Sequence, residues 1–412
     1  MTSELRRSLG VFDAVVIGLG AMVGAGIFVA LGPAAGAAGS GGGLLGALGL
    51  AAVVAYCNAM ASARLAARYP SSGGTYVYGR ECLGSFWGYL AGWAFVVGKT
   101  ASCAAMALTV GAYVWPGHAH AVAVAAVVAL TAVNYGGVQK SALLTRVIVA
   151  LVLAVLAAAS VVSLGAGGAA PPDLGGEVTA GGVLQAAGLL FFAFAGYARI
   201  ATLGEEVRDP ARTIPRAVPV ALGIALAVYV LVAVSVLTVL GPTALADSPA
   251  PLADAARAAD AGWLVPVVTV GAAVAALGSL LSLILGVSRT TLAMARDGYL
   301  PAALAAVHPR FQVPHRAELA VGAVVAVVAA TADVRGAIGF SSFGVLVYYG
   351  IANASAWTMG GRNRPLAVLG LVGCGALAFA LPLGSVLAGS AVVAAGVVAW
   401  AVSRGRPAPP RP

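Results

Sequence analysis

Residues 18–28 read Gly-Leu-Gly-Ala-Met-Val-Gly-Ala-Gly-Ile-Phe and lie within an apolar run at about residues 12–31. Glycine is a poor helix former, and a membrane tolerates non-helical backbone only where it lines a cavity or is buried in protein. A second interruption, Phe-Phe-Ala-Phe-Ala-Gly-Tyr at 191–197, falls inside the sixth apolar run. Matching interruptions in two halves of a chain indicate a transporter's binding site, and their offset of about 170 residues predicts a repeat of five helices.

The glycines of the first run could instead serve helix packing or nucleotide binding. Gly20 and Gly24 have the spacing of small residues that let membrane helices pack closely. For one such segment alone, packing accounts for the glycines as well as a binding site does, and the second interruption favours a site. A dinucleotide-binding loop is excluded because the spacing of Gly18, Gly20 and Gly24 is one residue too long, and no acidic residue follows at a distance suited to a ribose.

Composition excludes a soluble protein. Only 9% of the residues are charged, against roughly a quarter in ordinary soluble domains. The net charge of +9 lies in short loops, without a basic stripe and interleaved aromatics, so no nucleic acid partner is expected. The four cysteines form no CxxC pair, so neither a metal site nor a disulfide framework is predicted.

The apolar runs predict an all-α integral membrane protein of about 12 transmembrane helices, a single domain embedded in the lipid bilayer. The runs lie at about residues 12–31, 42–66, 84–114, 119–137, 144–166, 182–205, 216–240, 263–292, 317–332, 336–357, 366–380 and 384–402.

The distribution of Lys and Arg predicts the orientation. With both termini in the cytoplasm, only Arg257 and Arg335 of the 23 basic residues fall in outer loops, and only Lys99 and Arg199 fall within spans. Cytoplasmic loops carry the excess of basic residues, so this asymmetry supports an even number of spans. We therefore expect a multi-pass protein of the plasma membrane.

Four motifs in order along most of the chain resemble the amino acid–polyamine–organocation (APC) superfamily of permeases. The run Gly-Ala-Gly-Ile-Phe at 24–28 resembles its first-helix motif, and Tyr-Pro-Ser-Ser-Gly-Gly-Thr-Tyr at 69–76 resembles its loop before helix 3. The sixth-helix segment at 194–216 and Ala-Arg-Asp-Gly-Tyr-Leu-Pro at 295–301 are similar to two further motifs.

This resemblance implies a five-plus-five inverted repeat. Helices 1–5 would occupy about residues 12–166 and helices 6–10 about 182–357, with helices 11 and 12 at about 366–402 outside the repeat. It also implies secondary active transport of amino acids or related amines by alternating access.

The breaks suggest how a zwitterionic amino acid is bound. A half-helix N-terminus offers free N–H groups and a positive dipole end, so the substrate carboxylate is assigned to the N–H groups of Ala25, Gly26 and Ile27. The ammonium is assigned to carbonyls near Met22 and in the stretch 192–195, which ends at Ala195. Gly24 and Gly26 would let the substrate approach the backbone closely, and Gly196 at the second break is a further candidate substrate-binding residue.

Aromatic side chains stand at the second break. Phe192 or Phe194 could cover the substrate, whereas Phe191 is better explained by packing. In the superfamily an aromatic residue near this point occludes the site, and Phe192 matches it best.

Lys99 lies near the middle of the third span, where a lysine is costly and usually functional. It could neutralise substrate charge or exchange a proton, so proton coupling stays open; snorkelling is the structural alternative. Some superfamily members carry a lysine in helix 5, at a position that corresponds to about Val152 here. That departure puts coupling through helix 5 in doubt.

Arg199 lies just past the second break. An inner-gate ion pair with Glu205 is a better explanation for it than contact with the substrate, and a snorkelling position is the alternative. Ser279 and Ser282, on the eighth span, could offer hydroxyls to a cation, although such residues more often serve helix packing.

Other classes of function fit less well. No repeated ring of charge or carbonyl filter indicates a channel. No nucleophile motif or histidine cluster at membrane depth indicates an enzyme, and no cofactor or metal is expected. Among transported substrates, exchange of polyamines or cationic amino acids is the alternative, which Lys99 would disfavour by repulsion.

Overall fold

The computed structural model describes residues 9–69, 73–137, 142–166, 173–201, 206–361 and 363–404. Over these ranges the chain is helical, apart from connecting loops and one isolated bridge between Leu9 and Val207. The α-helices are α1 (Val11–Met22), α2 (Ala25–Val29), α3 (Leu31–Ala38), α4 (Gly41–Arg68), α5 (Thr75–Leu83), α6 (Ser85–Val114), α7 (Ala119–Tyr135), α8 (Ala142–Ala166), α9 (Ala180–Phe194), α10 (Ala198–Ala201), α11 (Pro210–Asp247), α12 (Pro251–Ala258), α13 (Val265–Arg296), α14 (His315–Thr331), α15 (Val334–Thr358), α16 (Arg364–Ala380) and α17 (Leu383–Arg404). Four 3-10 turns also lie within the described ranges: η1 (Pro116–His118), η2 (Ala195–Tyr197), η3 (Gly262–Leu264) and η4 (Ala302–Ala305).

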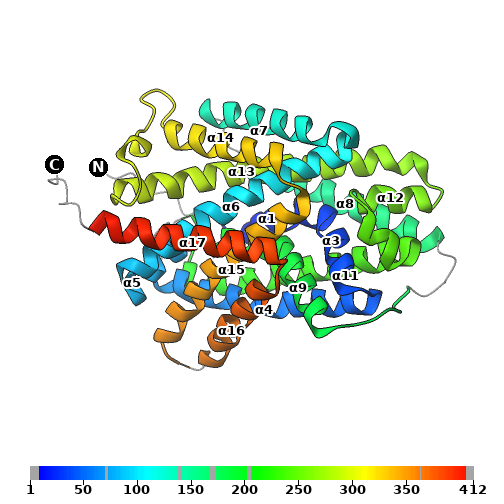
Figure 1. The fold of residues 1–412 in the computed structure, drawn as a ribbon, viewed down its shortest axis with the longest axis horizontal. Coiled ribbons are helices and arrows are strands. Elements are labelled where there is room, and N and C mark those ends of the chain that lie inside the picture. Colours follow the sequence, from blue (N-terminus) through cyan, green and yellow to red (C-terminus); the bar gives the residue numbers. More distant parts are fainter. Residues whose placement is uncertain are drawn as a thin grey trace.

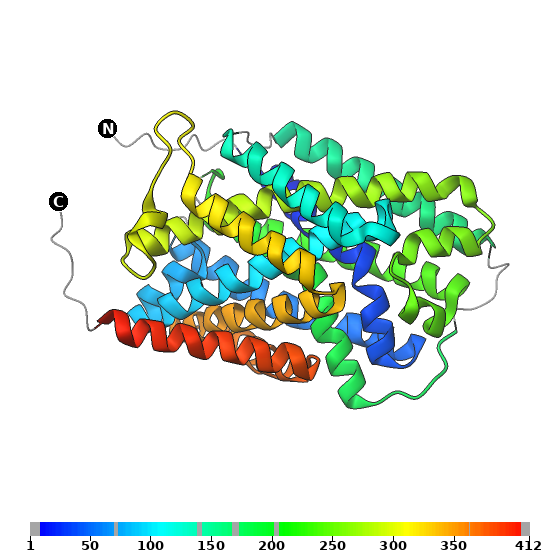
Figure 2. The same cartoon turned by 45° about the horizontal axis from the view of Figure 1, so that its top comes forward.

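The long helices run side by side along the long axis of the molecule (Figure 1). α17 ends at Arg404 at the same end of the bundle as the connection between α13 and α14, and we call this the terminal end (Figure 2). α7 and α14 pack along one edge, while α16 and α17 pack against α15. α6 crosses the centre of the bundle, in contact with both α13 and α15.

Each predicted span corresponds to a helix or a pair of helices. Within the described ranges, 10 segments are long and apolar enough to cross a membrane. The other two predicted spans are α14 and α16, with 17 residues each. At 1.5 Å per residue each measures about 26 Å, slightly less than the thickness of the hydrocarbon core.

Several boundaries differ from the predicted ones. α11 begins at Pro210, several residues earlier than predicted, because proline is well suited to the first turn of a helix. It also continues past a kink at Gly241, whose φ of +68° glycine adopts without steric cost. Short helices occupy three stretches expected to be loops: α3, α5 and α12.

Small residues bring the central helices into backbone contact. A Cβ atom on Gly98 of α6 would lie 3.1 Å from the backbone nitrogen of Val345 on α15. Ser102 and Ser341 of the same helices share a buried hydrogen bond of 2.5 Å. Close van der Waals packing and interhelical hydrogen bonds stabilise helix association where lipid offers no hydrophobic driving force.

Candidate functional site

The first span is broken where its glycines predicted. α1 ends at Met22, Val23 and Gly24 leave the helical conformation, and α2 begins at Ala25. No backbone hydrogen bond is donated by the N–H groups of residues 25–27 to any described residue. These N–H groups are therefore available to an anion at the start of the second half-helix.

The sixth span is interrupted at the predicted place as well. α9 ends at Phe194, and the backbone tightens into the 3-10 turn η2 before the short helix α10. This interruption is milder than the first, because the chain stays helical in handedness and only its hydrogen-bonding pattern changes.

The two breaks lie directly against each other. A Cβ atom on Gly26 would lie 2.6 Å from the Cα atom of Ala193, and one on Gly196 would lie 2.2 Å from the carbonyl oxygen of Ala21. Glycine at both positions therefore allows the two backbones to touch. Close helix packing and the candidate binding site thus involve the same positions.

Carbonyl oxygens from both breaks converge on Tyr229 of α11. Its hydroxyl lies 2.7 Å from the Met22 oxygen and 2.9 Å from the Ala193 oxygen. A phenol has one proton to donate. Two carbonyl oxygens that share one donor retain acceptor capacity, which suits a substrate ammonium group.

Lys99 reaches the second break. Its amine donates to the Ala195 carbonyl oxygen at 3.4 Å, and Tyr349 of α15 donates to the same oxygen at 3.2 Å. The Lys99 side chain is buried, at 8% exposure, and its amine points toward the breaks rather than toward a membrane surface. This geometry argues against snorkelling.

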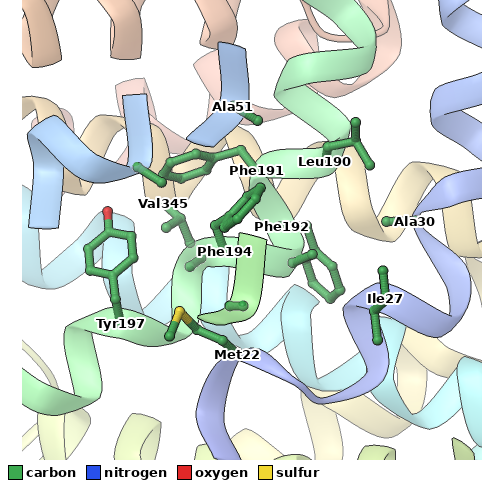
Figure 3. Packing of buried hydrophobic residues seen from close by; sticks show 14 of the residues in the cluster. Met22, Ile27, Ala30, Ala51, Leu190, Phe191, Phe192, Phe194, Tyr197 and Val345 are labelled. Carbon is green, nitrogen blue, oxygen red and sulfur yellow. The ribbon is translucent and has the colours of Figure 1, made fainter. Parts of the chain in front are cut away.

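Among the aromatics at the second break, Phe192 differs from its neighbours. Phe191 packs edge-to-face against Tyr349, and Phe194 packs against Tyr229, both without solvent exposure. Phe192 keeps 8% exposure and its ring points toward Ile27 of the other break (Figure 3). The geometry makes Phe192 the better candidate for a lid and gives Phe194 a packing role.

Residues on the terminal side of the breaks are more accessible than those on the opposite side. Ala21 and Gly196 are partly exposed and Arg199 is exposed. On the opposite side Phe28 is fully buried, and its carbonyl oxygen accepts a hydrogen bond from Tyr113 at 2.7 Å. This conformation is therefore closed by packing on the side away from the terminal end.

The predicted gate pair is only partly described. Arg199 lies on α10, close enough to Glu206 and Arg289 to interact with them electrostatically. Glu205 lies outside the described residues.

The two candidate cation ligands differ in position. Ser279 is buried, and a Cβ atom on Gly24 would lie 2.3 Å from its hydroxyl oxygen, so it faces the first break. Ser282 is exposed and donates to the Gly278 oxygen of its own helix at 3.1 Å. Val152, where some superfamily members carry a lysine, is fully buried.

The family model described as "Amino acid permease" matches residues 9–406. The chain belongs to this family. An uncharacterized transporter of Mycobacterium tuberculosis is 74% identical to this permease, over 97% of the permease chain and 92% of the transporter's own length. A second relative, human cationic amino acid transporter 4, is 32% identical over 85% of this chain and 59% of its own length.

Other comparisons support the same fold and family. The Bacillus subtilis branched-chain amino acid permease BcaP is 27% identical over 76% of this chain and 72% of its own length. The crystal structure of MhsT in complex with L-phenylalanine matches 96% of this chain and 99% of its own with a TM-score of 0.60, at 15% identity. The permease thus has the fold of this structure, as the broken first and sixth spans predicted.

Sequence reasoning missed two residues that shape the site. Tyr229 and Tyr349 are fully buried and bind the carbonyl oxygens of both breaks. The available signal for Tyr229 was a tyrosine inside a stretch of small and aliphatic residues, since a buried phenol needs a hydrogen-bond partner. Tyr349 follows Tyr348 in a span that contains other aromatic residues, so nothing in the sequence singled it out.

Proposed function

We propose that the permease transports neutral amino acids and binds them between its two broken spans. The observation that carries the proposal is the Lys99 amine at the Ala195 carbonyl. It puts a basic group beside the carbonyls that suit a substrate ammonium. A second positive charge on the substrate would add to the positive charge of Lys99 in this buried site, where like charges repel strongly.

The backbone geometry supports the orientation of the substrate. Its carboxylate is assigned to the N–H groups of Ala25, Gly26 and Ile27, which begin the second half of the first span. Its ammonium is assigned to the carbonyl oxygens of Met22 and Ala193, which share the hydroxyl of Tyr229. Neither assignment needs an ionised side chain.

The walls around the first break favour an apolar substrate side chain. Ala25 packs with Val110 and Ala276 in a small apolar cluster, and Phe192 faces Ile27 on the other side (Figure 3). An apolar pocket discriminates through buried area and shape, so aliphatic and aromatic side chains fit it best.

The relatives differ in the class of substrate for which they are named. One is named for cationic amino acids and one for branched-chain amino acids. Transport of cationic amino acids or polyamines is therefore the alternative. The position of Lys99 makes us favour the neutral class.

We also propose the plasma membrane as the location, with the terminal end in the cytoplasm. The basic residues Arg80, Arg146, Arg208, Arg212, Arg296, Arg310 and Arg316 belong to loops or helix ends that would then lie inside. No cofactor is needed for this function, and a proton is proposed below as the coupling ion.

Thermal stabilisation of the purified permease by the 20 standard amino acids and putrescine tests the substrate class, because a ligand that binds the folded state raises its stability. Uptake of the best stabiliser into proteoliposomes should then be inhibited by neutral amino acids and not by arginine or putrescine. Stronger stabilisation by arginine or putrescine than by any neutral amino acid would overturn the proposal.

The Lys99→Met variant provides an independent arm. It should bind arginine at least tenfold more tightly than the wild type if Lys99 excludes cations. Thr100→Val is the matched control, because the Thr100 hydroxyl bonds only to Val96 of its own helix among the described residues.

A further inference from the structure

Glu318 is a fully buried acid that the substrate site does not use. It lies in the first turn of α14 with 0% exposure. Both of its carboxyl oxygens lack a hydrogen-bond partner among the described residues. A buried carboxylate without a partner is strongly disfavoured, so an unpaired carboxyl at such a position requires a bound cation or a proton.

α7 faces this carboxyl in a defined antiparallel register. His120 at the start of α7 contacts the Ala329 oxygen near the end of α14 at 2.8 Å. Eleven residues further along α7, Thr131 faces α14: a Cβ atom on Gly322 would lie 2.6 Å from its hydroxyl oxygen. Tyr135 and His315 then lie with their ring centroids 6.1 Å apart.

The register places Asn134 in the same layer as Glu318. Asn134 follows Thr131 by one helical turn of α7, and Glu318 precedes Gly322 by one turn of the antiparallel α14. Asn134 donates from Nδ2 to the Leu281 oxygen of α13 at 3.1 Å. That bond orients the amide, and its Oδ1 atom has no partner among the described residues.

The site contains more acceptors than donors. The two carboxylate oxygens and the Asn134 Oδ1 atom can only accept hydrogen bonds. The Thr131 hydroxyl, also unpartnered in the described part of the chain, can donate a single proton. One additional proton on Glu318 would supply the missing donor between its carboxyl group and the amide oxygen.

The ionisable groups nearby leave Glu318 without an ion pair among the described residues. On α13, Arg289 acts on it electrostatically but forms no salt bridge with it. On α14 itself, His315 lies one turn earlier with Nδ1 unpartnered among the described residues, beside the rings of Tyr135 and His308. On α6, the amine of Lys99 points to Ala195, and the thiol of Cys103 is near Lys99. The two phenols of the same helix donate elsewhere, Tyr89 to the Gly396 oxygen and Tyr113 to the Phe28 oxygen.

We propose that Glu318, Asn134 and Thr131 form a buried proton-binding site at the junction of α7, α13 and α14. The carboxyl group binds one proton, which it shares with the Asn134 amide oxygen. The site lies near the terminal end of α14, so a movement of α14 away from α13 would expose the carboxyl and release the proton there. This proton would be the coupling ion of the permease, a role that rests on the proposed function.

Infrared difference spectroscopy of the purified permease without amino acid tests the site directly. At neutral pH we expect the wild type to show the C=O stretching band of a neutral carboxyl group. The band should be absent from Glu318→Gln. It should remain in the control Glu177→Gln, which changes an exposed acid. Gln resembles the neutral acid in shape, so the variant should fold. Asn134→Val should keep the band and shift its frequency.

Other outcomes would overturn the proposal. An identical carboxyl band in wild type and Glu318→Gln means that Glu318 is not protonated. A gain in thermal stability with sodium over choline, lost in Glu318→Gln, would assign the site to a metal cation instead. If Glu318→Gln fails to fold, an unshifted band in Asn134→Val would equally contradict it.

Coupling of transport to this proton is tested separately in proteoliposomes. Substrate uptake should acidify the lumen in the wild type, and Glu318→Gln should retain exchange of substrate while losing proton movement. Wild-type uptake without acidification would overturn coupling alone. Lack of any amino acid binding would overturn the proposed function and leave the infrared result unaffected.

Discussion

The amine of Lys99 donates a hydrogen bond to the carbonyl oxygen of Ala195, across 3.4 Å, and so joins the middle of α6 to the break in the sixth span. The same carbonyl accepts from Tyr349 of α15. Lys99 therefore lies at the break whose Ala193 carbonyl oxygen is assigned to the substrate ammonium. Substrate binding and the position of this amine should depend on each other.

Lys99→Met should lower the rate of neutral amino acid uptake at least tenfold, which corresponds to about 1.4 kcal/mol. The substitution keeps most of the length of the side chain and removes the group that holds Ala195. The effect is measured from initial uptake rates at pH values between about 5 and 8. A rate and pH profile equal to those of the wild type would make Lys99 a purely structural residue.

Tyr229→Phe should weaken substrate binding about fivefold or more. Removing the hydroxyl leaves the Met22 and Ala193 oxygens without the donor that aligns them, and a buried acceptor without its donor costs about 1–3 kcal/mol. Titration calorimetry on the purified variant gives the affinity. Tyr56→Phe, on an exposed face of α4, is the control and should bind as the wild type does.

Gly26→Ala should destabilise the permease by about 1–3 kcal/mol and reduce substrate binding, because overpacking forces the backbones apart. Its new methyl group would meet the Cα atom of Ala193 at 2.6 Å. Gly223→Ala is the matched control, since a Cβ atom there has nothing within 4 Å. Equal thermal stability and affinity in the two variants would show that the breaks are not in close contact in the functional protein.

Both termini should be cytoplasmic. Epitope tags at either end should react with antibody only after the cells are permeabilised, because the basic loops hold that end of the bundle inside. A C-terminal tag that is labelled on intact cells would mean an odd number of spans or the reverse orientation.

The predicted features that the structure confirmed depend on local sequence. The apolar runs determined the number and order of the spans, since the bilayer demands a set length of apolar helix. The glycines at 18–26 and the segment 191–197 located both interruptions, because glycine weakens a helix wherever it is placed. Lys99 stood out by itself as a charge at mid-span.

Contacts between distant helices were decided only by the tertiary structure. Nothing in the spacing of Tyr229 or Tyr349 assigns them to the carbonyls of Met22, Ala193 and Ala195, since those contacts depend on how α11 and α15 rotate against the breaks. Likewise, the sequence shows Glu318 only as an acid in the first turn of a helix, and its burial depends on how α14 packs against α7 and α13. Local sequence sets where a membrane helix breaks, whereas packing sets which polar groups meet there, because partners for buried hydrogen bonds come from other helices.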